Sequence, residues 1–412
     1  MKILITTQYF YPENFRINDF AFKMVKRGHE VSVITGVPNY PEGKFFGDYK
    51  ILGGENIEGV MVYRVPLIPR GKSRGFELAI NYLSFLMSAL IFGPFLLRKV
   101  RPDIIFGVNY SPATVGLVGV FFSRLKKAPL SLWVQDLWPD SLAATGAVRS
   151  GFILSAVGSM VRWIYHKSDL IFTQSRAFKD SIVSLGYAGP EKIRYLPNWA
   201  EDIFFNADVK SGDQPYLQLW PENKFIIMFA GNLGVAQSLA TIVRAAAEAR
   251  DYPIHWVFLG DGRQKEWLKN AVSDAGLQDN ISILGRYPLE DMPRLFKLAD
   301  VMLVTLKKDL SLSMTVPGKI QSYLRNAKPI LSALDGEGAA VIEESGAGFN
   351  VNCENFMGLA EAAVKLSESS PEELGKMSIN AKSYYDKNFD VDVLLSQFEV
   401  AVQHKCSKMD SA

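Results

Sequence analysis

The sequence contains few of the residues that bind metals or form disulfides. Only two of its 412 residues are cysteine, Cys353 and Cys406, and its four histidines are scattered at positions 29, 166, 255 and 404. Two cysteines so far apart exclude a disulfide framework and a zinc motif, and they are typical of a reducing compartment. No group of His, Asp or Glu has the spacing of metal ligands, so we expect no metal and no cofactor.

The sequence also has little excess charge of either sign. Lys and Arg number 45 against 43 Asp and Glu, which gives a net charge of +2. A balanced chain of this kind does not have nucleic acid as its main partner. Residues 1–7 become polar too soon for a signal peptide, so we expect the protein to be cytoplasmic.

Two α/β halves are visible, as the length of the chain predicts. The first half begins with a buried strand at 3–7 and a helix at 15–27, for which Asn14 is the predicted N-cap and Gly28 the residue after the end. Strands alternating with helices imply a mostly parallel sheet in each half. Further strands are predicted at 30–35, 60–65, 104–108, 130–134, 170–173, 193–196, 225–230, 256–259, 281–284, 301–305 and 330–333.

The segment from 313 to 331 is the most informative part of the sequence. An apolar strand leads through a polar loop into a short amphipathic helix that Pro317 opens, a residue well tolerated in the first turn. Lys319 lies in that turn, so a phosphate would meet both the partial positive charge of the helix end and a full positive charge. Taken alone, the segment is equally consistent with an ordinary capped helix and a solvated lysine.

Several longer motifs occur in a fixed order along the chain. They are QYFYPENFRIND (8–19), GVPNYPEG (36–43), DLWPDS (136–141), LPNW (196–199), GNLGVAQ (231–237) and the segment around Lys319. Through them the chain resembles, over essentially its whole length, the retaining GT-B glycosyltransferases of family 4. The resemblance is greatest to the subgroup that builds O-antigen and capsular polysaccharide and includes N-acetyl-L-fucosamine transferases. It implies two Rossmann-like doubly wound domains that face each other across a cleft, with a C-terminal helix crossing back.

The resemblance also assigns a role to each part of the chain. Residues 1–200 would bind the acceptor, 201–223 would form a linker rich in Asp, Gly, Pro and Gln, and 224–385 would bind the nucleotide sugar. Residues 386–412 would form the crossover helix.

The sequence departs from the family pattern where relatives bind the diphosphate. The family's Arg and Lys in the loop after the first strand of the second domain correspond here to Asn232 and Gln237. The family's pair of glutamates corresponds to Met314 and Ser322, which leaves the ribose contact unassigned. We therefore expect Lys319 and Arg16, the latter in the first turn of the first helix, to balance the phosphate charge.

The remaining candidate residues follow predicted strands. Asp136 is the candidate catalytic group near the acceptor hydroxyl, although Asp136 or Asp140 could instead cap the next helix. Glu337 matches the position where relatives contact the donor sugar. The resemblance places Gly231, Arg286 and Tyr287 around the nucleotide. Gly260 begins a short glycine-rich segment after a predicted strand, which could bind phosphate but is more often a turn. Asp390 and Asp392 form a DxD sequence that we interpret as the start of a terminal helix rather than a metal motif.

One uncharged segment, 78–97, is long enough to reach across a bilayer and has basic residues on both sides. Pro94 should break this helix, and Asn81, Ser84 and Ser88 share one face. Spanning, resting on the membrane and ordinary core packing all remain open, and we expect Leu83, Leu86 and Leu90 to form the lipid-facing side if the helix rests on lipid. The basic residues Arg124, Lys126 and Lys127 suit an anionic inner leaflet and a lipid-diphosphate acceptor.

The sequence therefore predicts a metal-independent retaining glycosyltransferase on the inner face of the cell membrane. It would move a sugar, of the N-acetylated 6-deoxyhexosamine type in the related subgroup, from a UDP-sugar to a polyprenyl-diphosphate-linked saccharide. A UDP-sugar 2-epimerase of the same fold is the alternative. A non-catalytic polymer-assembly protein on a decayed glycosyltransferase scaffold is a second one.

Overall fold

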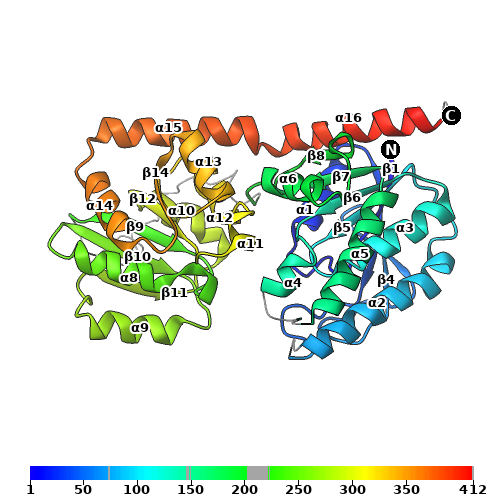
Figure 1. The fold of residues 1–412 in the computed structure, drawn as a ribbon, viewed down its shortest axis with the longest axis horizontal. Helices are drawn as coiled ribbons and strands as arrows, with labels where there is room; N and C mark the ends of the chain where they lie inside the picture. The colour runs from blue at the N-terminus through cyan, green and yellow to red at the C-terminus, as the bar shows by residue number, and fades with distance from the viewer. Residues whose placement is uncertain (73–74, 145–147, 149, 202–220, 222, 411–412) are drawn as a thin grey trace. The chain divides into compact units, whose positions relative to one another are not determined.

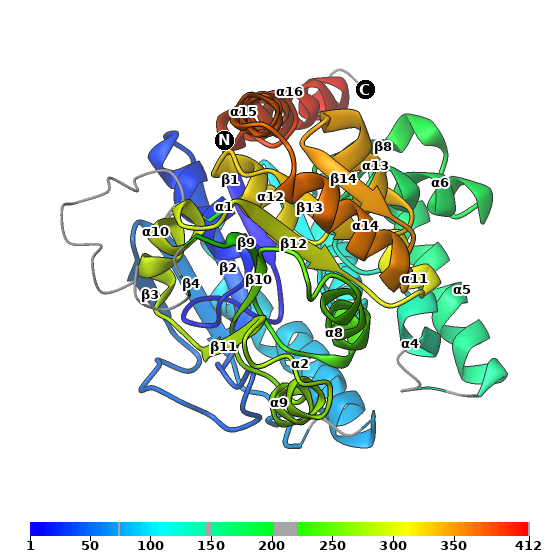
Figure 2. The same cartoon turned by 90° about the vertical axis from the view of Figure 1, so that its left-hand side faces the viewer.

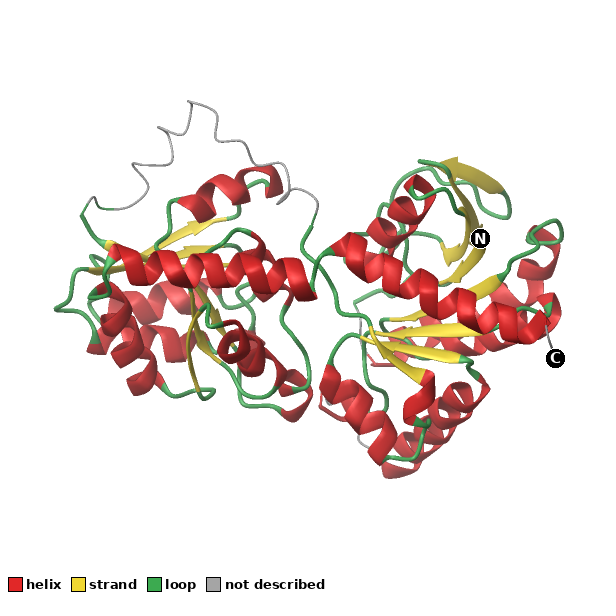
Figure 3. Ribbon diagram, turned by 90° about the horizontal axis from the view of Figure 1, so that it is seen from above, coloured by secondary structure: helices red, strands yellow, loops and turns green. Residues whose placement is uncertain are grey.

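The chain forms two compact units, each with its own sheet. The computed structural model describes residues 1–72, 75–144, 148, 150–201, 221 and 223–410. Unit 1 comprises Met1–Pro197 and Asp392–Ala412, and unit 2 comprises Asn198–Val391. Each unit is a mostly parallel sheet covered by helices on both faces, so both are Rossmann-like, as the sequence predicts (Figures 1 and 3).

The boundaries differ from those expected. The change from unit 1 to unit 2 falls between Pro197 and Asn198, and the chain returns to unit 1 at Asp392 rather than at 386. Most of the expected linker, 201–223, lies outside the described residues.

The sheet of unit 1 has the strand order β3-β4-β2-β1-β5-β6-β7-β8, in which β3 is antiparallel to its neighbour. Its strands are β1 (Lys2–Thr6), β2 (Glu30–Gly36), β3 (Gly54–Ile57), β4 (Val60–Val65), β5 (Ile104–Asn109), β6 (Leu130–Val134), β7 (Leu170–Thr173) and β8 (Ile193–Tyr195). Its helices are α1 (Arg16–Lys26), α2 (Gly75–Leu96), α3 (Val115–Lys126), α4 (Asp140–Ala144), α5 (Gly151–Lys167), α6 (Arg176–Ser184), η1 (Pro190–Lys192) and α16 (Val391–Asp410).

The sheet of unit 2 is entirely parallel and has the order β11-β10-β9-β12-β13-β14 (Figure 2). Its strands are β9 (Phe225–Ala230), β10 (Ile254–Leu259), β11 (Ile281–Gly285), β12 (Val301–Thr305), β13 (Ile330–Ala333) and β14 (Gly348–Val351). Its helices are η3 (Val235–Gln237), α8 (Leu239–Glu248), α9 (Lys265–Asp274), η4 (Leu289–Asp291), α10 (Met292–Lys297), α11 (Leu310–Ser313), α12 (Gly318–Arg325), α13 (Glu337–Ser345), α14 (Phe356–Ser367) and α15 (Pro371–Asn388).

The strands of unit 2 are apolar because both faces of the sheet are buried. Met228 and Ala230 of β9 face one core, and the helices α10, α12, α13 and α15 complete that core. Ile227 and Phe229 face the core on the other side of the sheet, which α8, α9 and α14 complete. Two edge strands, β3 and β14, were not predicted from the sequence. Their sequences, GENI and GFNV, are short and only partly buried, and they lack the continuous apolar pattern of the central strands.

The first helix starts differently from the prediction. Phe15, not Asn14, occupies the N-cap position of α1, and no side chain of the cap residue bonds to the helix. The hydroxyl of Tyr110, from the loop after β5, instead accepts a hydrogen bond from the N–H of Ile17 at 2.9 Å. A residue 93 positions away therefore caps this helix, which local sequence cannot show. Gly28 follows the helix with φ of +85°, as predicted for a C′ residue.

The C-terminal helix α16 belongs to unit 1 from Asp392 onward. The ring of Phe398 lies 5.0, 4.9 and 5.1 Å from the rings of Phe20, Phe106 and Phe172, so it packs directly against the sheet and α1.

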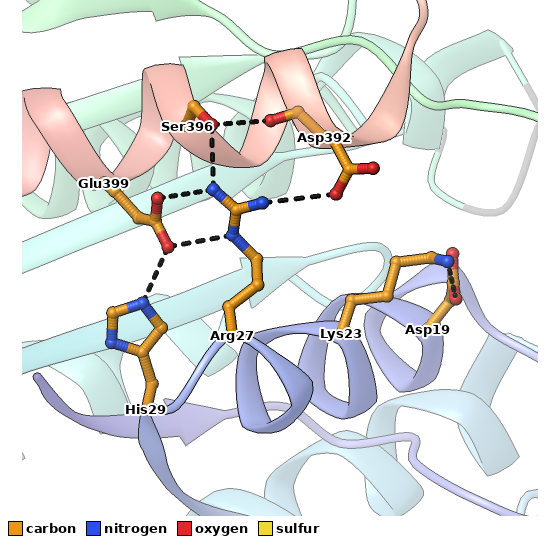
Figure 4. A network of polar contacts seen from close by, with 7 residues as sticks. All are labelled: Asp19, Lys23, Arg27, His29, Asp392, Ser396 and Glu399. Carbon is orange, nitrogen blue, oxygen red and sulfur yellow. Dashed lines mark hydrogen bonds and ion pairs between the residues drawn. The ribbon is translucent and has the colours of Figure 1, made fainter.

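Polar contacts hold the same helix to the end of α1 (Figure 4). The carboxylate of Glu399 accepts hydrogen bonds from Arg27 at 2.8 and 3.0 Å and lies 2.7 Å from the ring nitrogen of His29. These contacts lower the pKa of Glu399 to about 2. The DxD residue Asp392 lies in the first turn of α16, as its interpretation as a helix-start residue predicts, and it pairs with Arg27 at 3.2 Å.

Candidate functional site

The strand order of unit 2 creates a topological switch point between β9 and β12. From these adjacent strands the chain continues outward in opposite directions, to β10 and to β13. In doubly wound sheets, ligands bind at the carboxyl ends of two such strands. The loop after β9 (231–238) is fixed to β12 there, because Lys307 N–H donates to the Ala236 carbonyl at 2.9 Å and the Thr305 hydroxyl donates to the Gln237 carbonyl.

Two predicted glycines bring the loops after β9 and β10 into direct backbone contact. Gly231 N–H donates to the Leu259 carbonyl and Leu233 N–H to the Asp261 carbonyl, each at 2.8 Å. Gly260 has φ of +142°, and a Cβ on it would lie 1.8 Å from the carbonyl oxygen of Gly231. Only glycine fits this position, so Gly260 has a definite packing role in the loop.

Lys319 reaches this loop from the first turn of α12, where Pro317 occupies the N-cap position. Its Nζ donates to Gln237 Oε1 at 2.6 Å and lies 3.6 Å from the centroid of the buried Phe229 ring. A Cβ on Gly231 would lie 2.7 Å from Lys319 Cε, so glycine at 231 makes room for the lysine stem.

The position of α12 is itself fixed. The hydroxyl of the buried Tyr323, one turn further along α12, lies 3.2 Å from both the N–H and the carbonyl oxygen of Ala230. Burial lowers the pKa of Lys319 to about 7, far below the usual value of a lysine. An anion bound beside this amine would favour its charged form and so raise its pKa. Binding of the anion and protonation of Lys319 would therefore be coupled.

Asn232 lies at the rim of the same loop and is exposed. A Cβ on Gly262 would lie 2.7 Å from Asn232 Oδ1, so the Asn232 amide faces the loop after β10. The structure therefore brings together Gly231, Asn232, Gln237, Gly260 and Lys319, which come from three separate parts of the sequence.

Glu337 is the first residue of α13, next to the loop that leads into α12. Gly336 has φ of +69°, and a Cβ on it would lie 2.2 Å from the Ser313 carbonyl oxygen. A Cβ on the next glycine, Gly338, would lie 3.2 Å from Pro317 Cδ. These close approaches place the start of α13 against the loop 313–317, beside the turn that carries Lys319.

Arg286 and Tyr287 follow β11 at the same end of the sheet. Arg286 is exposed. The pKa of Asp261 is lowered mainly by the hydrogen bond from the Gly262 N–H, with smaller contributions from the charges of Lys265 and Arg286. Tyr287 is partly buried against the core on the α12 side of the sheet. Arg286 is thus coupled to the loop after β10, next to Gly260.

Glu201 was not predicted from the sequence. Ser322, which stands where the family carries its second glutamate, is buried, and its hydroxyl lies 3.4 Å from Glu201 Oε2 and 3.3 Å from the Gly318 carbonyl. A carboxylate therefore lies close to this position, but it comes from a residue 121 positions earlier. No local motif marks Glu201.

In unit 1, Asp136 lies two residues beyond the end of β6. Burial raises the pKa of its carboxyl group, and bonds from the Ser141 and Trp138 side chains and the Leu137 N–H partly oppose that shift. Asp140, at the start of α4, is exposed instead. A half-buried carboxylate of raised pKa can accept a proton near neutral pH more readily than an exposed one.

Arg16 begins α1 at the switch point of unit 1, between β1 and β5. Its charge lies near the buried hydroxyl of Tyr110, whose pKa is raised by that burial. Aromatic rings surround this helix start: Phe15 lies 4.9 Å from Tyr9, 5.1 Å from Tyr40 and 5.0 Å from Tyr110.

Glu13 connects two of these loops and was also not singled out from the sequence. Its carboxylate is 2% exposed and accepts hydrogen bonds from the N–H groups of Asn39 at 2.8 Å and Tyr40 at 2.7 Å. Glu13 and Asn39 lie within the motifs at 8–19 and 36–43. The motifs predicted that these two loops are important, but the hydrogen bonds between Glu13 and the backbone of the second loop are visible only in the structure.

Among the described residues, no group of three or more His, Cys, Asp or Glu side chains is placed to hold a metal ion.

Comparison with known proteins agrees with this fold. Residues 14–199 match the family of glycosyl transferase 4-like domains, and residues 224–369 match glycosyl transferases group 1. The chain is therefore a glycosyltransferase of the GT-B architecture, with one of the two characteristic domains in each unit.

One relative matches almost the full length of the chain. The glycosyl transferase WcaI of Escherichia coli (strain K12), assigned by its name to colanic acid biosynthesis, is 28% identical over 97% of this chain and 98% of its own.

Solved structures share the fold at low sequence identity. Anabaena Alr3699/HepE in complex with UDP has a TM-score of 0.72 at 16% identity, covering 98% of this chain and all of its own. WaaG, a glycosyltransferase involved in lipopolysaccharide biosynthesis, has a TM-score of 0.66 at 14% identity, covering 98% and 99%.

Proposed function

We propose that the protein transfers a sugar from a UDP-sugar to a polyprenyl-diphosphate-linked saccharide during bacterial surface polysaccharide synthesis, with retention of anomeric configuration. The observation that carries the donor half of this proposal is the Lys319–Gln237 contact at 2.6 Å, at the switch point of unit 2. The full-length relative assigned to colanic acid biosynthesis supports the polysaccharide pathway. The solved structure of similar fold that contains UDP supports the choice of nucleotide.

The donor diphosphate would lie over the first turn of α12. Departure of UDP from the sugar concentrates negative charge on the β-phosphate, and a fixed cation with free N–H groups stabilises such charge. Lys319 would bind this phosphate, while Gly231 and Gly260 would allow the backbone to approach it. Lys319 supplies positive charge where some transferases use a divalent ion, so we propose that the reaction needs no metal.

Other residues would act around the sugar and the base. Glu337, at the start of α13, would contact the donor sugar, and Arg286 with Tyr287 would contact the base. Arg16 of unit 1 would add a second cation to the diphosphate, and Asp136 would position or deprotonate the acceptor hydroxyl. The sugar would be of the N-acetylated 6-deoxyhexosamine type, as in the related subgroup, and the protein would work at the cytoplasmic face of the membrane.

A donor screen tests this proposal directly. The protein is incubated in EDTA with individual UDP-sugars, with and without a polyprenyl-diphosphate saccharide, while release of UDP and formation of glycolipid are followed. We expect acceptor-dependent release of UDP with one donor, and NMR of the product should show the anomeric configuration of the donor.

The same screen separates the alternatives. Conversion of a UDP-sugar to its C2 epimer without acceptor would establish the epimerase instead. Binding of UDP-sugars with no turnover on any lipid acceptor would favour the non-catalytic assembly protein.

A further inference from the structure

All exposed residues of helix α2 of unit 1 are apolar, while its buried side contains a polar residue, Asn81, among apolar ones. Asn81 is fully buried, where its side-chain oxygen accepts from Gln8 Nε2 and its Nδ2 donates to the Ile68 carbonyl, both at 2.6 Å. The Ser84 hydroxyl accepts from the Ile68 N–H at 2.9 Å. A surface helix in water normally turns its polar side outward, so α2 is not adapted to water on its outer face.

The outer face of α2 is a continuous apolar stripe. Its members are 53–77% exposed and recur at helical spacing: Phe76, Leu83, Met87, Ile91 and Phe95. This differs from the expectation for this helix, because Leu86 is only 9% exposed and Leu90 lines a groove. Of the three residues expected on this side, only Leu83 belongs to the stripe.

The groove continues the apolar surface from α2 to α3 and α5. It has a volume of about 630 Å³, and its apolar walls include Leu90, Phe121 and Leu125. Trp163 of α5 lies at the same groove, 41% exposed, with the Arg124 guanidinium 5.6 Å from its ring. A Trp ring beside an Arg is typical of the boundary between lipid tails and head groups.

The charges around this surface are nearly all positive. The helices α3 and α5 contain no Asp or Glu, and α2 contains only Glu77 in its first turn. The exposed basic residues on these helices and directly after them are Arg98, Lys99, Arg101, Arg124, Lys127, Arg162 and Lys167. A surface of negative charge complements this arrangement, and few carboxylates lie nearby to repel it.

One side of α2 is fixed to the protein, so the helix cannot cross a bilayer. A Cβ on Gly93 would lie 2.5 Å from the Phe122 ring and 2.9 Å from Ile34 Cδ1. The helix also continues through Pro94 to Leu96 instead of breaking there. The proline removes one hydrogen bond of the last turn, and only two helical residues follow it. Length and composition alone would allow α2 to span a membrane, but its close contacts at Gly93 exclude this. Only 28% of its most apolar window is buried, because the other side of the helix faces outward.

We propose that the apolar stripe of α2, with the groove between α2, α3 and α5, docks on an anionic phospholipid bilayer. The helix lies in the plane of the interface, its stripe enters the acyl region, and the basic residues meet the head groups. The surface shares no residue with the set assigned to the donor, so the test does not depend on transfer activity.

The test is sedimentation of the full chain with vesicles of phosphatidylcholine containing phosphatidylglycerol, compared with phosphatidylcholine alone. The variant carries Leu83→Gln, Met87→Gln and Ile91→Gln, three exposed residues whose replacement leaves the core intact. The matched control carries Ile379→Gln and Val400→Gln, which are 71% and 66% exposed on other helices. Circular dichroism and thermal melting confirm that each protein is folded.

We expect the wild type and the control to sediment with the anionic vesicles and to be partly released by salt. The stripe variant should lose about tenfold or more in vesicle affinity. In a separate variant, Arg98→Gln with Lys99→Gln should lower the affinity about fivefold for each charge removed.

Three results would overturn the proposal. The first is a wild type that does not sediment with the vesicles, and the second is a folded stripe variant that sediments as well as the wild type. The third is a dimer in analytical ultracentrifugation that the stripe changes dissociate without effect on vesicle binding, which would assign the stripe to self-association.

Discussion

The Nζ of Lys319 donates to Oε1 of Gln237 at 2.6 Å, across 82 positions of sequence. The contact joins the first turn of α12 to the loop after β9, and it engages the side chains of both residues. Gln237 is neutral where related enzymes carry a cation, and its side-chain oxygen is engaged by the lysine. Lys319, from α12, therefore brings a cation to this loop.

Replacement of Lys319 by Met should weaken UDP binding by about 2–3 kcal/mol, the scale of a lost charge-assisted hydrogen bond. Met keeps most of the stem that packs over Phe229, so the loop should stay folded. Isothermal titration calorimetry with UDP measures the change.

Lys328→Met is the matched control for this substitution. Lys328 is partly buried in unit 2, its pKa is lowered to about 8 by that burial, and its Nζ donates to the carbonyls of Lys297 and Ala299. We expect this variant to melt earlier and to bind UDP normally. If Lys319→Met also binds UDP normally, the phosphate assignment is wrong.

UDP affinity should depend on pH above neutrality. The pKa of Lys319 is about 7 in the free protein, and a bound diphosphate should raise it. Between these two pKa values binding takes up a proton, so the affinity falls by up to about tenfold per pH unit as the pH rises. The phosphate itself titrates near pH of about 6, below this window. Titrations from pH 6.5 to 9.5 should show the slope in the wild type and lose it in Lys319→Met, and equal slopes in both would contradict the assignment.

Gly260→Ala should abolish UDP binding and destabilise unit 2. The new Cβ would lie 1.8 Å from the Gly231 carbonyl oxygen, so the loops after β9 and β10 must separate. Gly276→Ala is the control, because Gly276 also has a positive φ of +65° but a Cβ added there would meet no other atom within 4 Å. The control should cost only the backbone strain, about 1 kcal/mol, and bind UDP. Equal behaviour of the two variants would show that the close approach is unimportant.

Asp136→Asn should lower turnover by roughly a hundredfold or more while UDP binding is retained. Because burial raises the pKa of Asp136, the acid limb of kcat/KM should lie above the ordinary range of an aspartate. Asp140→Asn, at the exposed start of α4, should change turnover little. An Asp136→Asn enzyme that transfers sugar normally but melts earlier would establish a capping role instead.

Glu399→Gln should loosen α16 from unit 1 by about 2 kcal/mol, because the carboxylate bonds to both Arg27 and His29. The folded pKa of about 2 lies below the ordinary glutamate value of 4.5. The stabilisation is therefore fully present above pH 4.5 and is lost as the pH falls toward 2. Hydrogen exchange of α16 between pH 6 and 3 measures this.

Asp392, whose side chain is 79% exposed, provides the control for the Glu399 substitution. Its replacement by Asn should change the exchange of α16 very little, because an exposed ion pair is worth little. A Glu399→Gln protein with the same exchange rates as the wild type would show that packing of Phe398 alone holds the helix.

The sequence by itself determined the class of fold and the loops that carry the site. Parallel strands buried on both faces must be apolar along their length, so β6, β9 and β12 are visible as continuous runs. The turn after such a strand must be polar or glycine-rich, which marked Gly231, Gly260 and Asp136. Pro317 and Lys319 were informative because the requirements of a helix start are local.

The tertiary structure alone decided which residues meet. Tyr110 caps α1, Glu201 lies beside Ser322, and Glu13 binds the backbone of Asn39, each across a separation that no periodic pattern encodes. The outer side of α2 was predicted only in part from the sequence, because of the three leucines expected there, Leu83, Leu86 and Leu90, only Leu83 belongs to the exposed stripe. Its orientation followed from Asn81, whose amide must be satisfied by Gln8 and Ile68 when it is buried, and that requirement turned the apolar stripe outward.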